Sequence, residues 1–145
     1  MVEINNRKAH FDYEILDTLE SGIVLTGTEV KSIRQGNANL RDSYAIIRND
    51  EMFLLNMHIS VYKEGNIFNH DETRTRKLLV HKKEISKLKS KLEIEGLTLV
   101  PLKLYFKNNN AKILIGLAKG KREFDKRETI KKRDVDREIS KYLKK

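Results

Sequence analysis

The sequence contains no cysteine, no tryptophan and a single proline, Pro101, in 145 residues. Without cysteine, a disulfide framework, a thiolate zinc site and a thiol nucleophile are all excluded. No apolar run approaches the roughly 18 residues that a membrane-spanning helix needs. The first residues, MVEINNRKAHFDYE, lack the apolar core of a signal peptide. We therefore expect a cytoplasmic protein that no proline-rich linker divides.

Positive charge is what the chain has in excess. It carries 30 Lys and Arg against 21 Asp and Glu, a formal net charge of +9. Such an excess favours a polyanionic partner, either a nucleic acid or an anionic membrane surface. Residues 119–145 hold 12 basic and 6 acidic side chains, and so +6 of that net charge. We expect a folded domain over 1–118 and a basic C-terminal tail over 119–145, disordered alone because it buries too little apolar surface.

Turn-forming residues separate three pairs of apolar runs in the first part of the chain, and each pair predicts a β-hairpin. The pairs are 13–19 with 23–26 around Ser21-Gly22, 45–47 with 52–55 around residues 48–51, and 98–106 with 111–118 around Asn108-Asn109-Asn110; a further apolar run spans 77–80. Alternation predicts two strand faces: Val100, Leu102, Leu104 and Phe106 on one strand, and Ile113, Ile115 and Leu117 on its partner. Pro101 indicates an edge or a bulge.

Two helices interrupt these predicted strands. One is expected from Thr28, its cap, to Gly36, its stop, with Val30 and Ile33 on one side; the other spans 82–95, carries Ile85, Leu88 and Leu92, and ends at Gly96. Many short antiparallel strands with about two or three helices predict a mainly β fold. The small oligonucleotide-binding-type (OB-like) barrel is the member of that class best matched to a basic protein.

No catalytic set emerges from the polar residues. The four histidines, His10, His58, His70 and His81, lack metal-ligating spacing. His70-Asp71 would suit an acid–base dyad, but a loop turn stabilised by Asp71 is the interpretation we favour. Gly120-Lys121 lacks the upstream glycine and the hydroxyl residue of a phosphate-binding loop. We predict a protein that is not an enzyme and needs no metal or other cofactor.

RNA binding suits the pattern better, because basic residues lie near aromatic side chains on which bases can stack. The candidates are Phe11, Tyr62, Phe68, Tyr105 and Phe124, each of which also fits a core or rim position, although Phe124 stands in a wholly charged segment. Further along the tail, Val135, Ile139, Tyr142 and Leu143 fall at i, i+4, i+7 and i+8. This stripe fits a helix docked on the domain, a helix on a membrane surface, or a segment that folds on RNA. The charge favours the last, and the lack of tryptophan argues against the membrane.

Six stretches of the chain are distinctive in this order: NRKAHFDYEI, ESGIVLTGTEVKSIRQG, NLRDSYA, HDETRTRKLLVHKKEI, GLTLVPLKLYFKNN and GKREFDKRE. The order and spacing of GTEVKSIRQG, RTRKLL and GKREFDKR are the most specific part. Together they resemble the tmRNA-binding (SsrA-binding, small protein B) family of bacterial trans-translation. The resemblance covers nearly the whole chain. It implies an OB-type barrel that binds the tRNA-like domain of tmRNA and delivers tmRNA to stalled ribosomes.

The resemblance also implies particular binding residues. Asn6, Glu20 and Leu79 match the family pattern as tmRNA contacts. We add the neighbouring basic residues as expected phosphate contacts: Arg7, Lys8, Lys31, Arg34, Arg76 and Lys77. Glu20 would accept a hydrogen bond from a base edge or a ribose hydroxyl, or would orient an arginine. A structural acid in a hairpin is the alternative.

In the family, the tail enters the decoding centre and the empty mRNA channel of a stalled ribosome. Gly120, Lys121, Phe124, Asp125, Lys126 and Arg127 match the decoding-centre motif, and Tyr142 and Leu143 lie where relatives carry apolar tail residues. A basic segment would order, as a helix, only inside that vacant phosphate-lined channel. The chain departs from the pattern at Phe11 and Phe124, both usually His, and at Val61 and Glu72, usually Pro.

Two other functions compete with this adaptor. A constitutive ribosomal RNA-binding or ribosome-assembly protein has the same composition. A nuclease that uses Asp12, Asp17 or His70-Asp71 is disfavoured, since these residues form no clustered metal-ligand set.

Overall fold

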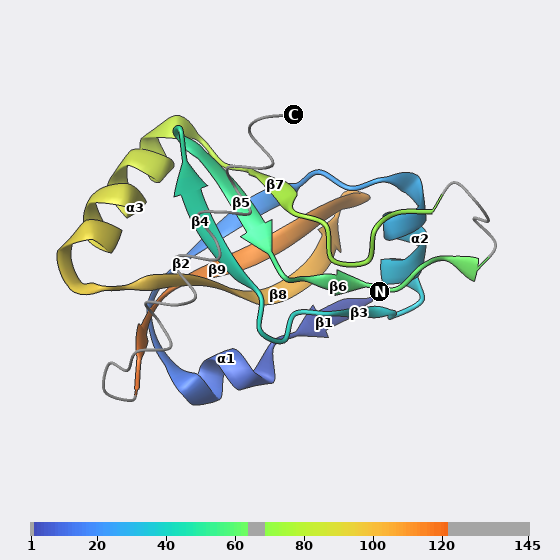
Figure 1. Ribbon diagram of the computed structural model, residues 1–145, viewed down its shortest axis with the longest axis horizontal. Helices are drawn as coiled ribbons and strands as arrows, with labels where there is room; N and C mark the ends of the chain where they lie inside the picture. Colours follow the sequence, from blue (N-terminus) through green and yellow to red (C-terminus); the bar gives the residue numbers. More distant parts are fainter. Residues whose placement is uncertain (1, 64–68, 122–145) are drawn as a thin grey trace.

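The computed structural model describes residues 2–63 and 69–121 (Figure 1). Its elements in chain order are β1 (Glu3–Asn5), α1 (Arg7–Asp12), β2 (Tyr13–Ile23), α2 (Gly27–Arg34), β3 (Ala38–Asn39), β4 (Tyr44–Arg48), β5 (Glu51–Leu55), β6 (His58–Ile59), β7 (Arg76–Leu79), α3 (Lys82–Glu95), β8 (Thr98–Lys107) and β9 (Asn110–Gly120). The predicted tail from residue 122 onward lies outside the described residues.

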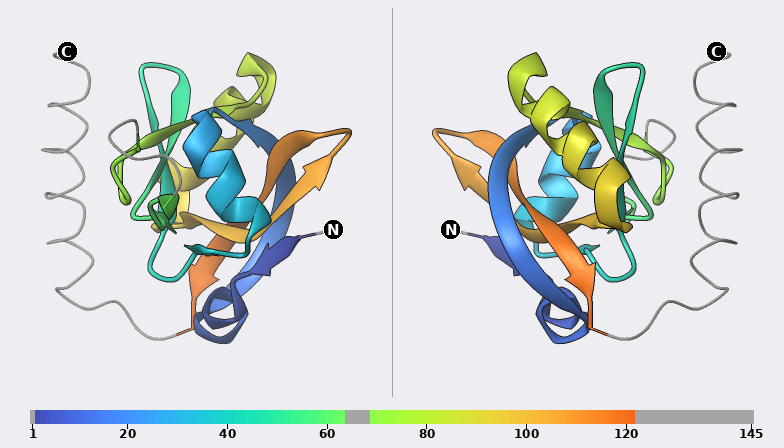
Figure 2. Two further views of the ribbon diagram at one scale, coloured as in Figure 1. Left: turned by 90° about the vertical axis from the view of Figure 1, so that its right-hand side faces the viewer. Right: turned by 90° about the vertical axis from the view of Figure 1, so that its left-hand side faces the viewer.

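The strands close into a ring. The main sheet has the order β1-β8-β4-β5-β7-β2-β9, and β8 also pairs with β9, so the sheet returns to its start. All of its pairings are antiparallel. Helix α1 packs beside β2 and β8, α2 lies near β6, and α3 contacts β5 (Figures 1 and 2). The described residues thus confirm the predicted mainly β fold, with an antiparallel sheet that closes on itself and three helices where two or three were expected.

Strand β2 is the main departure from the expected fold. It runs unbroken from Tyr13 to Ile23, so the hairpin predicted around Ser21-Gly22 is wrong. Ser21 is buried and its hydroxyl donates to the carbonyl of Ile113 at 3.1 Å, as a residue inside a sheet does. A Cβ added at Gly22 would lie 3.2 Å from the Cβ of Leu79. Glycine is favoured there by the close neighbouring strand, not by a turn.

A bulge in β8 changes which side chains face the core. The register with β9 shifts between Pro101 and Lys103, which confirms the bulge expected at Pro101. Leu104 packs in the main core, whereas Val100 and Leu102 pack in a second cluster with Ala9 and Ala118. The prediction that Val100, Leu102, Leu104 and Phe106 share one face is therefore wrong, because the extra residue inverts the alternation along the strand.

Helix α2 begins two residues earlier than predicted. Its cap is Thr26, whose hydroxyl accepts from the Glu29 N–H, while the Glu29 carboxylate accepts from the Thr26 N–H. This reciprocal capping box needs Thr and Glu three residues apart, which Thr28 does not offer. The Thr28 hydroxyl instead lies 2.9 Å from Nδ1 of His70. Helix α3 spans 82–95 and ends at Gly96, as expected.

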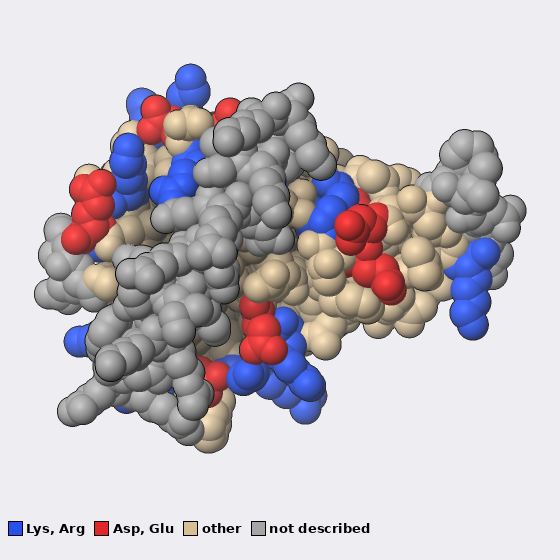
Figure 3. Space-filling model, in the orientation of Figure 1, with Lys and Arg blue, Asp and Glu red and all other residues tan. Residues whose placement is uncertain are grey.

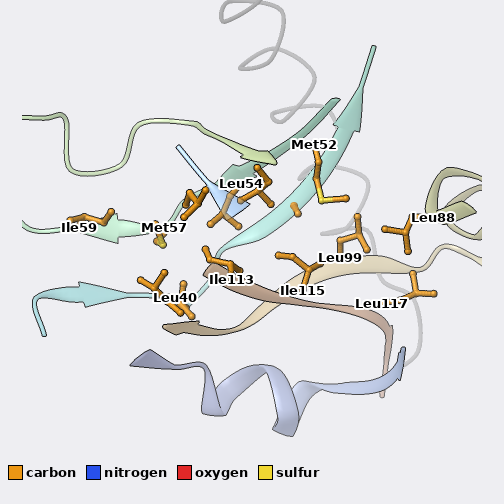
Figure 4. Close-up of a cluster of buried hydrophobic side chains, with 14 of the residues drawn as sticks. Leu40, Met52, Leu54, Met57, Ile59, Leu88, Leu99, Ile113, Ile115 and Leu117 are labelled. Atoms are coloured by element: carbon orange, nitrogen blue, oxygen red, sulfur yellow. The ribbon is translucent and has the colours of Figure 1, made fainter. Parts of the chain in front are cut away.

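The remaining sequence predictions hold well. The β4–β5 and β8–β9 hairpins are both present, and their turns contain residues with positive φ: Asn49, Asp50, Asn108 and Asn109. Inside the ring, Ile113, Ile115 and Leu117 face one core together with Met52, Leu54 and Leu99 (Figure 4). Burying each such side chain contributes about 1.5–3 kcal/mol. Strand β9 extends to Gly120, two residues beyond the boundary predicted at 118.

Candidate RNA-binding surface

The outside of the ring across strands β7, β2, β9 and β8 carries an acidic side chain among lysines. On β2, Leu19 packs against the core and Glu20 points outward. On β9, Ile113 packs in the core, so Lys112 beside it points outward. On β8, Leu104 packs in the core, so Lys103 and Tyr105 point outward. Tyr105 and Lys112 are paired across these two strands, and Gly22 of β2 is paired with Leu79 of β7. We call this surface the Glu20 face; its residues are Glu20, Leu79, Lys103, Tyr105, Lys107 and Lys112.

Glu20 and Tyr105 form the polar centre of the Glu20 face. The Tyr105 hydroxyl donates to the exposed Glu20 carboxylate, and Lys107 Nζ lies 3.6 Å from the other carboxylate oxygen. The hydrogen bond from Tyr105 lowers the pKa of Glu20, and the positive charges of Lys107 and Lys112 lower it further. Burial and the Glu20 carboxylate raise the pKa of Tyr105 to about 12. Near neutral pH, Glu20 is therefore an ionised acceptor and Tyr105 a neutral donor.

This geometry suits a structured RNA. The lysines can neutralise phosphates, while an ionised carboxylate held in place by a tyrosine can accept a hydrogen bond from a base amino group or a ribose hydroxyl. Leu79, 55% exposed, adds an apolar contact beside Gly22. The structure thus brings together Glu20 and Leu79, which lie far apart in the sequence. Lys103, Lys107 and Lys112 are not among the contacts predicted from the sequence, although strand alternation counted from the core residues places them on this surface.

Helix α2 adds a second basic group. Lys31 and Arg34 are both exposed, as a phosphate contact requires. The Arg34 guanidinium lies 4.6 Å from the ring centre of Phe106, and Lys31 Nζ lies 5.5 Å from that of Tyr62. Phe106 packs against the main core, on the opposite side of β8 from Tyr105, so α2 and the Glu20 face are two separate basic groups. The cation–π contacts hold the two cations over aromatic rings while leaving them open to solvent.

Two other predicted residues have structural partners instead of open surface. Arg76 is fully buried, with Nε 2.6 Å from the Glu29 carboxylate and NH1 2.7 Å from the Met57 carbonyl. These bonds leave its guanidinium closed to a phosphate, so we replace the expected phosphate contact of Arg76 with a structural role. Asn6 is 6% exposed and caps α1, because its Oδ1 accepts from the Ala9 N–H at 3.2 Å. We expect Asn6 to affect RNA binding indirectly, by fixing the position of α1.

The other predicted basic residues are accessible. Arg7 and Lys8 are exposed on α1, and Lys8 pairs with Asp42 at 2.9 Å. Lys77 on β7 pairs with Glu51 on β5, with 2.9 Å between Nζ and the carboxylate. Such exposed pairs contribute little to stability, so each lysine can exchange its partner for a phosphate. On the face shown in Figure 3, the basic side chains of the described residues stand in small groups, several of them next to acidic ones.

The start of the predicted tail segment is only partly within the described residues. Gly120 ends β9, and Lys121 is tied back to the domain because its N–H donates to Asp12 O at 3.0 Å and its Nζ to His10 O at 3.2 Å. The other residues of the predicted decoding-centre and channel set lie outside the described residues: Phe124, Asp125, Lys126, Arg127, Tyr142 and Leu143.

The described residues offer no metal-binding cluster of three or more His, Asp or Glu. The two His70 ring nitrogens lie 2.9 Å from the Thr28 hydroxyl and the Ile59 carbonyl, and Asp71 accepts from the Thr73 N–H at 3.0 Å. These contacts confirm the loop turn that we favoured over an acid–base dyad. None of the helices in the described part is long and apolar enough to cross a bilayer.

A closed antiparallel barrel whose outer surface carries lysines, exposed cation–π pairs and a fixed acceptor is typical of a nucleic-acid-binding module. The sequence model of the SmpB protein family matches residues 3–145, and the chain belongs to this family of non-enzymatic RNA-binding proteins.

Similar proteins support the same family. The SsrA-binding protein of Enterococcus faecalis is 62% identical over 139 residues, which cover 96% of this chain and 90% of that protein. The SsrA-binding protein of Carboxydothermus hydrogenoformans is 63% identical over 139 residues, covering 96% and 93%. A solved chain from the work titled "tmRNA-SmpB: a journey to the center of the bacterial ribosome" matches with a TM-score of 0.73 and 47% identity, covering 96% of this chain and 98% of that one. The resemblance found in the sequence motifs is thereby confirmed.

Proposed function

We propose that this chain is a cytoplasmic adaptor of bacterial trans-translation that binds the tRNA-like domain of tmRNA through the Glu20 face and helix α2. The observation that carries the proposal is the Glu20–Tyr105 pair, an exposed acceptor in fixed position among Lys103, Lys107 and Lys112. It occurs in a chain 62% identical to an SsrA-binding protein.

The chemistry divides between affinity and orientation. Lysines of the Glu20 face, with Lys31 and Arg34 of α2, neutralise phosphates and supply most of the binding free energy. Glu20 contributes one directed hydrogen bond, because a carboxylate repels phosphate and is favoured only where a donor meets it. Leu79 packs against the flat side of a sugar or base. The protein performs no bond making or breaking in this function.

The test is a pair of substitutions on the full chain. Glu20→Gln keeps the size of the side chain but removes its charge, and we expect it to weaken binding of the tRNA-like domain about tenfold. Glu93→Gln on α3, also exposed, is the matched control and should bind like the parent protein. Fluorescence anisotropy with a labelled tRNA-like domain measures both. Equal affinities for the two variants would remove Glu20 from the interface.

We also propose that the segment from Gly120 onward enters the decoding centre and the vacant mRNA channel of a stalled ribosome. The support is its charge, its match to the family motif, and the position of Lys121, where the chain leaves the ring beside α1. Intact mRNA would occupy the same space, so only ribosomes without mRNA in the channel would accept the segment.

Truncation separates this role from tmRNA binding. A chain ending at Lys121 keeps β9 complete, whereas a cut at 118 removes its last strand residues. We expect the truncated chain to bind tmRNA like the full chain and to support no peptide tagging in a reconstituted system with stalled ribosomes. Tagging at the normal rate would contradict the proposed tail function while leaving the Glu20 face untouched.

A further inference from the structure

A cavity of about 250 Å³ opens between helix α3 and strand β2, at the edge of the main core. Its floor consists of apolar side chains that belong to the core or pack against it: Leu19, Leu88, Leu99, Ile115 and Leu117. Leu99 and Leu117 are paired across β8 and β9, and Figure 4 shows them together with Leu88 at one end of the core. Sites for drug-sized ligands usually measure about 300–1,000 Å³, so this cavity suits a fragment of the size of one nucleobase.

Charged side chains of both signs surround the mouth of the cavity. They are Glu84, Lys87 and Lys91 of α3 and Asp17 of β2. Asp17 alternates with Leu19, whose side chain packs against the core, so its carboxylate is turned towards α3. Lys91 Nζ lies 3.7 Å from that carboxylate, and the two side chains are 50% and 62% exposed. Such a loose, solvated pair contributes little to stability, so both groups can exchange their partner for a ligand.

The two lysines belong to a longer row on α3, which we call the α3 lysine row. Lys83, Lys87 and Lys91 are exposed and follow one another at intervals of four residues, which places them along one side of the helix about 6 Å apart. Like charges at this spacing destabilise a helix, and a lysine in the first turn also opposes the helix dipole. Within the described part of the chain, Lys91 alone of the three forms an ion pair. A polyanion would supply the missing negative charge.

We propose that the cavity and the α3 lysine row bind single-stranded RNA, with one unstacked base in the cavity and the flanking phosphates on the row. The apolar floor accepts the flat face of a base, as in pockets that hold an extruded nucleotide. Lys87 and Lys91 pair with phosphates. The carboxylates of Asp17 and Glu84 accept hydrogen bonds from an exocyclic amino group, which cytosine carries and uracil lacks. A free amino acid would also match a rim of both signs, but a row that continues to Lys83 suits a chain of phosphates.

This site is distinct from the Glu20 face. Leu19 and Glu20 are neighbours in the chain but lie on opposite faces of β2. Figure 1 shows α3 at one end of the barrel, from which β8 runs towards the opposite end. Tyr105 is six residues further along β8 than Leu99, which corresponds to roughly 20 Å. Because the tRNA-like domain is assigned to the Glu20 face, we expect a different RNA here, and the proposal does not depend on tmRNA binding.

Methyl NMR on the isotope-labelled full chain tests the proposal, with a cytidine hexamer as the probe. We expect the methyl signals of Leu88 and Leu117 to shift on titration and to show NOEs to the cytosine ring protons. A hexamer of abasic spacers carries the same phosphates without bases, and it should leave these methyl signals in place. A uridine hexamer, which has rings of the same size, should bind more weakly because uracil offers no amino group to the carboxylates.

Substitutions of exposed residues in the full chain keep the result specific. One phosphate contact to a single strand changes affinity about fivefold at about 0.1 M salt, so we expect Lys87→Gln and Lys91→Gln each to weaken binding of the cytidine hexamer by that factor. Lys89→Gln makes the same change on the opposite side of α3, outside the cavity, and should bind like the parent protein. Glu20→Gln should also leave this affinity unchanged, which separates a failure of this site from a failure of the Glu20 face.

Three results would overturn the proposal. The first is an equal loss of affinity in Lys87→Gln and Lys89→Gln, which would mean attraction by net charge alone. The second is equal binding of the cytidine and abasic hexamers, or methyl signals of Leu88 and Leu117 that stay in place, since no base would then enter the cavity. The third is displacement of the cytidine hexamer from the cavity by the tRNA-like domain, which would assign the cavity to the same RNA as the Glu20 face.

Discussion

Glu20 and Glu29 are the same residue type nine positions apart, yet they do different work. Glu29 is fully buried, and its carboxylate accepts hydrogen bonds from Arg74 and Arg76 at 2.6 Å each. Glu20 is exposed on the ring, bound to a neutral tyrosine with lysines around it. A buried carboxylate saturated by arginines holds loops and strands together, whereas an exposed one with a fixed orientation is available to a ligand. Burial and partner type, not residue identity, separate a carboxylate that is closed to solvent from one that is open to a ligand.

The largest expected effect is a loss of stability on substitution of Glu29, the buried carboxylate of the two. Glu29→Gln leaves the Arg76 guanidinium buried without its counter-charge, and we expect it to lower the free energy of unfolding by about 3 kcal/mol or more. Glu20→Gln, the same change at an exposed position, should leave that free energy almost unchanged. Urea unfolding followed by circular dichroism measures both. Similar losses in the two variants would mean that Glu20 is also a structural residue.

Acid titration sharpens the comparison. Burial alone would raise the pKa of Glu29, but hydrogen bonds from Arg74 and the Thr26 N–H hold it below the usual value of 4.5. A carboxyl group whose pKa is lower in the folded state adds stability above its unfolded pKa and loses it as the pH falls through the folded one. Unfolding free energy should therefore decline below about pH 4.5, and less steeply in Glu29→Gln. A variant that declines as steeply as the parent would show that other carboxyl groups dominate.

The smallest effect concerns the lysines around Glu20. Removing one phosphate contact should reduce the slope of log affinity against log salt by about 1. We expect this for Lys112→Gln on the Glu20 face and no change for Lys83→Gln at the start of α3. Anisotropy titrations across a range of salt concentrations provide the slopes. An unchanged slope for Lys112→Gln would place the phosphate path elsewhere.

Much of the fold follows from local signals. The turns at 48–51 and 108–110, the Gly96 helix stop and the inward row Ile113, Ile115 and Leu117 all depend on neighbouring residues, and all are confirmed. The errors arise where a distant partner decides. Ser21-Gly22 resembles a turn, but a strand passes close beside Gly22. The side chains of β8 change faces at the register shift with β9 between Pro101 and Lys103, and a simple alternating pattern does not include such a shift.

The site was predictable in part for the same reason. Glu20 and Leu79 came from the family pattern, and only the pairing of β2 with β7 shows that they are neighbours. The basic run Arg74-Thr75-Arg76-Lys77 predicts a phosphate contact for Arg76. Arg76 lies two residues before the buried Leu78 on β7, so strand alternation places both side chains on the inner face. There the Arg76 guanidinium pairs with the Glu29 carboxylate. Charge in a sequence indicates a nucleic-acid partner, but it does not tell which charges are enclosed.

The central claim is that RNA binds the Glu20 face, and NMR titration of the isotope-labelled full chain with the tRNA-like domain tests it most directly. We expect the largest amide shift changes at Glu20, Leu79, Tyr105, Lys107 and Lys112, with smaller ones on α2. Changes confined to α3 and the β4–β5 hairpin, with the Glu20 face unaffected, would contradict the account.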